Sequence, residues 1–168
     1  MKGSGGNVPR RTNRGRRPSA TGGARHCGGC RACCITPGFQ AREGEAPFEK
    51  PPGVPCPHLV TIGCGIYDER PPVCRRFECG WLQAPNLPDA LRPDRCGVLF
   101  YANDNARGEG VAIYAHELEP GAADRPLPAW LLQQLAAQAT VFLVRAGRCE
   151  VFTADPVVQE RLAGQEAE

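Results

Sequence analysis

Eight of the ten cysteines of this 168-residue chain fall between Cys27 and Cys79. The same stretch is rich in proline and glycine and shows no sustained helical or strand period. A segment of this kind cannot bury enough side chain to offset the entropy lost when it becomes ordered. Its fold must therefore be held by its sulfurs, either through disulfides or through bound metal.

The first residues of the chain favour reduced thiols. Residues 1–25 carry seven basic side chains and no acid, and they lack the apolar run of a secretory signal. No stretch of the chain approaches the 18 or more apolar residues of a transmembrane helix. We therefore predict a cytoplasmic protein without a membrane segment, in which the cysteines bind metal instead of forming disulfides.

The spacing of the cysteines indicates thiolate ligands. Two residues between cysteines let both sulfurs converge on one ion, and Gly28 and Gly29 permit backbone conformations that a Cβ atom would block. Adjacent cysteines project in different directions, so Cys33 and Cys34 are expected to serve different metals. The predicted ligands of these two neighbouring sites are Cys27, Cys30, Cys33, Cys34, Cys56, Cys64, Cys74 and Cys79.

The identity of the metal stays open at this point. Eight thiolates could complete two Cys₄ zinc sites, or one iron–sulfur cluster and a second metal site. The run Cys27-x2-Cys30-x2-Cys33 shares its spacing with bacterial ferredoxins, which favours iron. The ferredoxin fourth cysteine comes three residues later, whereas Cys34 follows Cys33 directly, and this favours zinc.

The cysteine pattern resembles a known family. The match rests on the opening run of four cysteines, on Cys56-Pro57-His58-Leu59, on Gly63-Cys64-Gly65-Ile66-Tyr67, and on Arg70-Pro71-Pro72-Val73-Cys74-Arg75-x-Phe77-x-Cys79. These motifs are similar to those of the CxxCxxCC cysteine-cluster family, also called the YkgJ family, a zinc- or iron-chelating domain. The resemblance covers residues 26–82 and implies chelation by all eight cysteines. Some members carry flagellin lysine methylation activity, but this chain lacks a glycine-rich loop for a methyl donor, so that activity is not expected here.

The remaining candidate residues favour structural roles. None of the three histidines forms an acid–base pair with a nucleophile, so the sequence identifies no catalytic site and leaves open whether the protein is an enzyme. His58 is either a metal ligand or, as its context favours, a turn residue. His116 is expected at the surface, and Cys96 and Cys149 are expected to be small apolar strand residues.

The second half of the chain can build a conventional core. Its pattern predicts two β-hairpins, a helix and a short terminal helix, over residues 98–116, 141–152, 128–138 and 155–164. In the helix we expect Leu127, Trp130, Leu131 and Leu135 to share one face. The predicted class is α+β: an irregular, metal-folded cysteine module packed on a small antiparallel sheet with helices. Its divisions are a disordered basic tail (1–25), the cysteine module (26–82) and a small α+β region (83–168).

These observations predict a metal-binding protein that chelates zinc or iron, with metal ions as its first partners. A first alternative is an iron–sulfur protein that transfers electrons to a protein redox partner or senses oxidants. A second alternative is a zinc-built adaptor that binds protein or nucleic acid. Nucleic acid is disfavoured, because the arginine-rich tail lacks the interleaved aromatic residues on which bases stack.

Overall fold

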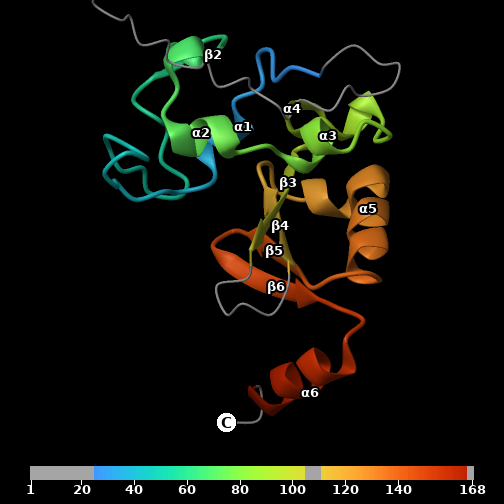
Figure 1. Ribbon diagram of the computed structural model, residues 1–168. Helices are drawn as coiled ribbons and strands as arrows, with labels where there is room; N and C mark the ends of the chain where they lie inside the picture. The colour runs from blue at the N-terminus through green and yellow to red at the C-terminus, as the bar shows by residue number, and fades with distance from the viewer. Residues whose placement is uncertain (1–24, 105–110, 166–168) are drawn as a thin grey trace, which may run out of the picture.

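The computed structural model describes residues 25–104 and 111–165, which form a cysteine module and a sheet-based region (Figure 1). The predicted disordered tail lies outside the described residues, apart from Arg25. The elements of the module are short: α1 (Ala32–Ile35), β1 (Leu59–Val60), β2 (Gly63–Cys64), η1 (Tyr67–Glu69), α2 (Pro72–Arg76) and α3 (Gly80–Gln83). The sheet-based region contains η2 (Asp89–Leu91), α4 (Pro93–Cys96), β3 (Val98–Asp104), β4 (Val111–Glu117), η3 (Ala122–Asp124), α5 (Pro126–Ala136), β5 (Val141–Arg145), β6 (Arg148–Phe152) and α6 (Pro156–Gln165).

The four long strands form one sheet in the order β3-β4-β5-β6, and the α+β class is confirmed. Both predicted hairpins are present as the antiparallel pairs β3–β4 and β5–β6. The sheet is mixed, where an antiparallel one was expected, because β4 and β5 run parallel. The connection between these two strands contains α5, and a helical crossover of this kind returns the chain to the same end of the sheet.

The main hydrophobic core lies between the sheet and α5, which packs against β5 and β6. Its most deeply buried large side chains are Leu91, Leu99, Leu143, Val98 and Val141. From α5, the core receives Pro128, Leu131 and Leu132. The predicted helix face was wrong, because Leu127 and Trp130 are 42% and 48% exposed. Positions 128, 131, 132 and 135 follow the helical repeat of three to four residues and form the inner face.

One cysteine of this region departs from its predicted position. Cys96 is the last residue of the short helix α4 instead of a strand residue, and it is buried in the core with its Sγ 3.2 Å from the carbonyl oxygen of Val98. Cys149 lies on the edge strand β6, as expected, and is exposed. Because β3 and β6 are opposite edges of the sheet, the strand after Cys96 and the strand of Cys149 are not paired.

The cysteine module itself buries little apolar surface. Between residues 26 and 80, the buried hydrophobic residues are Ala32, Ala46 and Cys79 alone, and each is small. Helix α3 spans the predicted boundary at residue 82 and packs on β3. The module therefore meets the sheet-based region along a narrow apolar seam, and apolar packing contributes little within the module.

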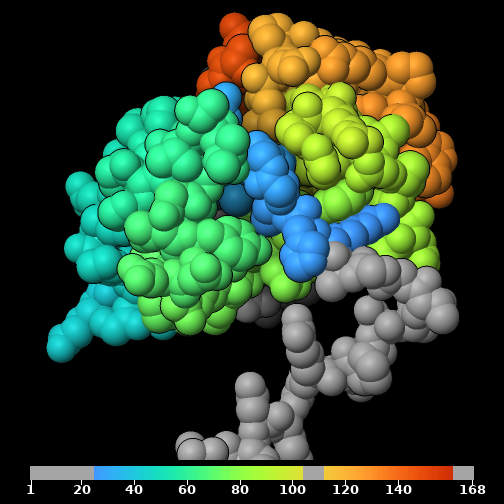
Figure 2. Space-filling view, turned by 90° about the horizontal axis from the view of Figure 1, so that it is seen from above, coloured from blue at the N-terminus to red at the C-terminus, as the bar shows by residue number. Residues whose placement is uncertain are grey.

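The N-terminal end of the described chain strengthens that seam. In Figure 2 the segment that begins at Arg25 runs between the module and the sheet-based region. The Arg25 guanidinium lies 4.4 Å from the ring centre of Trp81 and donates hydrogen bonds to the carbonyl oxygens of Ala84, at 2.9 Å, and Pro85, at 2.8 Å.

None of the described helices has the length and apolar character needed to cross a membrane.

Candidate metal centre

The first four cysteines are positioned by a tight turn and one helical turn. The amide of Cys30 donates to the carbonyl of Cys27 at 3.0 Å. Gly28 has a φ of 54°, a left-handed conformation that favours glycine, as the sequence predicted for this turn. Cys33 and Cys34 follow on α1, and both are half-buried.

A second group of backbone contacts brings Cys56 and Cys64 to α1. The amide of Cys56 donates to the carbonyl of Cys34 at 2.9 Å. Leu59 then pairs with Cys64 across the β1–β2 hairpin, and its amide donates to the carbonyl of Cys56 at 2.9 Å. These backbone contacts hold together three cysteines that are far apart in the sequence: Cys34, Cys56 and Cys64.

The last two cysteines flank a short helix. Pro72 is the first residue of α2, and Cys74 lies on this helix. Cys79 immediately precedes α3 and is only 8% exposed. Phe77, between the two cysteines, packs against the core of the sheet-based region. The module therefore contacts the sheet through the same segment that carries two predicted ligands.

Electrostatic contributions and backbone contacts group the eight thiols into two overlapping neighbourhoods, which we call the first and second sets. The first set consists of Cys27, Cys30, Cys33 and Cys79. Burial raises the pKa of Cys27, and the charges of Cys79, Cys30 and Cys34 raise it further, so one member of the other set also acts on it. The pKa of Cys33 is raised by its hydrogen bond to Cys34, by burial, and by the charges of Cys34, Cys27 and Cys30.

The second set consists of Cys34, Cys56, Cys64 and Cys74. Burial raises the pKa of Cys74, and the charges of Cys56, Cys34 and Cys64 raise it further. The two sets meet at the adjacent residues Cys33 and Cys34, so each receives one cysteine of that pair. Neighbouring thiols repel one another when they are ionised, and a bound cation removes that repulsion.

The sets are neighbourhoods of thiols and do not form finished coordination shells. All ten cysteines are free. Within residues 25–104 and 111–165, no three histidine, cysteine, aspartate or glutamate side chains converge in an arrangement that would hold a metal ion. Zinc–sulfur bonds are about 2.3 Å long. Binding of a metal by either set therefore requires the side chains to turn inward.

A buried cation distinguishes the second set. Lys50 is 3% exposed, and its Nζ donates to the carbonyl oxygens of Ile35, at 2.7 Å, and Pro37, at 2.6 Å. Every ion pair found among the described residues is made by an arginine, so no carboxylate there pairs with Lys50. An unpaired buried charge costs several kcal/mol. Burial lowers the pKa of Lys50, and the groups whose charge raises it are four thiols, Cys56, Cys34, Cys33 and Cys74.

Other charged residues also act on the thiols of the two sets. The charge of Arg70 lowers the pKa of Cys27, Cys34 and Cys74, so it acts on both sets, while its guanidinium lies 3.6 Å from the ring centre of Tyr67. The pKa of Cys30 is raised by burial and by the charge of Asp94. The second set is thus the more electropositive of the two.

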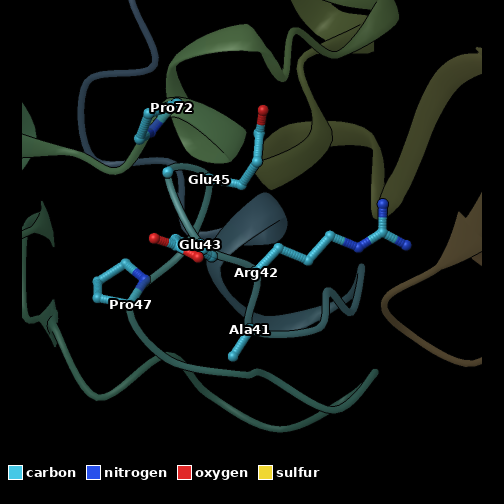
Figure 3. A pocket seen from close by; sticks show the side chains of 8 residues that line it. Ala41, Arg42, Glu43, Glu45, Pro47 and Pro72 are labelled. Carbon is cyan, nitrogen blue, oxygen red and sulfur yellow. The ribbon is translucent and has the colours of Figure 1, made fainter.

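One hollow beside the module is separate from the thiols. This hollow, of about 510 Å³, is lined by residues 41–47 and Pro72. Figure 3 shows side chains that line it. Its lining residues include Arg42, Glu43 and Glu45 but no cysteine. This hollow therefore does not belong to the candidate metal centre.

Residues outside the two sets have other contacts. The His58 ring lies edge-on to Phe48, with their centres 5.2 Å apart, which fits a packing role. His116 was expected at the surface, but it is half-buried on β4 and lies 3.1 Å from the Tyr101 hydroxyl. The sequence analysis missed Lys50, although Lys2 and Lys50 are the only lysines in the chain.

Comparisons of the chain with protein families, with curated proteins and with solved structures give no match. The resemblance to the CxxCxxCC family therefore rests on the cysteine spacing and remains a prediction.

We expect Cys34 to be the most reactive thiol of the module when the protein is reduced and metal-free. The hydrogen bond from Cys33 lowers the pKa of Cys34 to about 7, with Lys50 and Arg70 adding to the effect. A lowered pKa populates the nucleophilic thiolate as pH rises through 7. Alkylation by iodoacetamide, followed by mass spectrometry, should show Cys34 labelled with a midpoint near this pH.

The exposed Cys149 is the control for accessibility. Burial and the charge of Glu150 raise its pKa, so it should react only at higher pH. Equal pH profiles for Cys34 and Cys149, or simultaneous labelling of Cys33 and Cys34, would contradict the expected order.

Proposed function

We propose that this protein binds soft metal ions, zinc or iron, through its eight clustered cysteines. Cys27, Cys30, Cys33 and Cys79 would hold one metal centre, and Cys34, Cys56, Cys64 and Cys74 would hold the other. Thiolates are the preferred ligands of zinc and of iron–sulfur clusters, which makes this donor set suitable for both. The resemblance to a metal-chelating family supports the same function.

The clustering of eight free thiols in two adjoining neighbourhoods is the observation that supports the proposal. Four sulfurs complete a tetrahedral site, and the adjacent pair Cys33 and Cys34 supplies one ligand to each set. The weak apolar packing of the module gives a second reason. A structural zinc site contributes about 10–16 kcal/mol of apparent binding free energy, which becomes folding free energy when the ligands are otherwise disordered.

The buried Lys50 supports anionic sulfurs in the second set. A zinc ion with four thiolates carries a net charge of −2, and such a centre is stable at low dielectric only when donors or cations surround it. The Lys50 ammonium lies within the module without a carboxylate partner in the described residues. Thiolates of the second set would supply the missing countercharge, and Lys50 would offset part of theirs.

An iron–sulfur cluster in the first set is the second candidate. The spacing Cys27-x2-Cys30-x2-Cys33 matches the ferredoxin run, and Cys79 would replace the missing fourth cysteine. Such a cluster would supply one-electron chemistry to a protein redox partner. Both candidates place the protein in a reducing compartment, which we take to be the cytoplasm, because coordination needs thiols that are free of disulfides.

Metal analysis of cysteine variants tests the proposed division. Protein purified without oxygen should contain two metal centres per chain by native mass spectrometry. The double substitution Cys27→Ser and Cys79→Ser should remove one centre, and Cys56→Ser with Cys74→Ser should remove the other. The metal content itself distinguishes zinc from iron.

Cys96→Ser and Cys149→Ser are the matched controls, because these cysteines belong to neither set. Both should retain two centres. A chain that binds no metal would contradict the division. So would double variants that each lose part of the metal from both centres.

Lys50→Met tests the role of the buried cation. Methionine keeps an unbranched side chain but removes the charge and leaves the carbonyls of Ile35 and Pro37 without their donor. Loss of a group that supports metal ligands typically weakens metal affinity about 10- to 100-fold. Competition with a chelator should therefore show weaker binding at the second set and unchanged binding at the first.

Arg42→Met removes an exposed positive charge from the same module and serves as the control. It should leave both affinities unchanged. Equal affinities for Lys50→Met and the unsubstituted protein would show that Lys50 does not support the second set.

A further inference from the structure

A tyrosine and a histidine on the sheet form a pair that the proposed metal centres do not use. The Tyr101 hydroxyl on β3 lies 3.1 Å from Nε2 of His116 on β4. Both side chains are half-buried and occupy the face of the sheet opposite to α5. Their rings are also stacked, with centres 5.5 Å apart and planes inclined by 15°.

This pair belongs to a row of aromatic rings that starts at the cysteine module. The Phe77 ring lies 5.3 Å from Tyr101, Tyr101 lies 5.4 Å from Tyr114, and Tyr114 lies 5.3 Å from Phe142. Phe77 is the module residue between Cys74 and Cys79. The row therefore crosses three strands and ends beside two of the predicted metal ligands.

The surroundings keep both members of the pair neutral. Burial, together with Tyr114, raises the pKa of Tyr101 to about 12, and burial lowers the pKa of His116. With its proton on Nδ1, a neutral imidazole offers Nε2 as an acceptor for the phenolic hydrogen. A phenol loses an electron more readily when a base at hydrogen-bond distance takes its proton in the same step.

We propose that Tyr101 and His116 form a redox-active pair. Tyr101 gives one electron to a one-electron oxidant while its phenolic proton moves to Nε2 of His116. The products are a neutral tyrosyl radical, an imidazolium and the reduced oxidant. A one-electron donor reverses the step by reducing the radical, and the proton then returns from His116 to the phenol oxygen.

The aromatic row links the pair to the cysteine module, because Phe77 belongs to the segment that carries Cys74 and Cys79. An iron–sulfur centre in that segment would be too weak an oxidant for Tyr101, because the reduction potentials of such clusters lie below that of a tyrosyl radical. The chemistry of the pair itself needs only an outside oxidant.

Photochemical oxidation of the full-length protein tests the pair. Tris-bipyridine ruthenium, photo-oxidised to its +3 state, serves as the one-electron oxidant, and the radical is followed by electron paramagnetic resonance. We expect a tyrosyl signal that is lost in Tyr101→Phe and retained in Tyr67→Phe and Tyr114→Phe. A signal retained in Tyr101→Phe would overturn the proposal.

His116→Phe tests the proton acceptor, because it keeps a planar ring and removes the nitrogen. Oxidation of Tyr101 should become slower and should depend on the concentration of buffer base; an unchanged rate would overturn the proposal.

In the unsubstituted protein, the radical should show a hyperfine coupling to a proton that exchanges in D₂O, and absence of this coupling would also overturn the proposal. Metal content measured on the same sample is a separate result, so a protein without metal that still forms the radical contradicts the proposed function alone.

Discussion

The crowding of eight thiols in a segment that buries almost no apolar side chain governs the rest of this structure. Ionised thiols at this density repel one another, and protonated thiols contribute little cohesion. Between residues 26 and 80 the buried hydrophobic residues are two alanines and Cys79. Coordination bonds would offset both deficits at once, because a cation neutralises the sulfurs and ties four distant points of the chain together.

The sheet-based region supplies what the module lacks. Its core is built mainly from Leu91, Leu99, Leu143 and neighbouring apolar residues, and the module joins this core through Phe77 and Cys79. The first set of thiols therefore lies against a preformed core, whereas the second set lies in the outer part of the module with Lys50. This difference in position gives the two proposed centres different electrostatic surroundings.

The sequence predicts the parts of the molecule that depend on local pattern. Apolar runs joined by glycine-bearing loops predict both hairpins, and Gly28 and Gly29 predict a turn that a Cβ atom would disfavour. Local sequence patterns do not predict features that depend on tertiary structure. The parallel pairing of β4 and β5 follows from where α5 returns the chain. The burial of Lys50 depends on the carbonyls of Ile35 and Pro37, at and just beyond the end of α1, which accept hydrogen bonds from its ammonium. The Tyr101–His116 contact likewise depends on the register of β3 and β4.

Hydrogen exchange before and after removal of metal tests the central claim most directly. The measurement compares amides of the module, such as those of α1 and α2, with amides of β3, β4 and β5 in protein isolated without oxygen. If coordination holds the module, exhaustive chelation should abolish protection in the module and leave the sheet protected. Equal protection of the module after chelation, or disulfides between its cysteines in freshly isolated protein, would contradict the account.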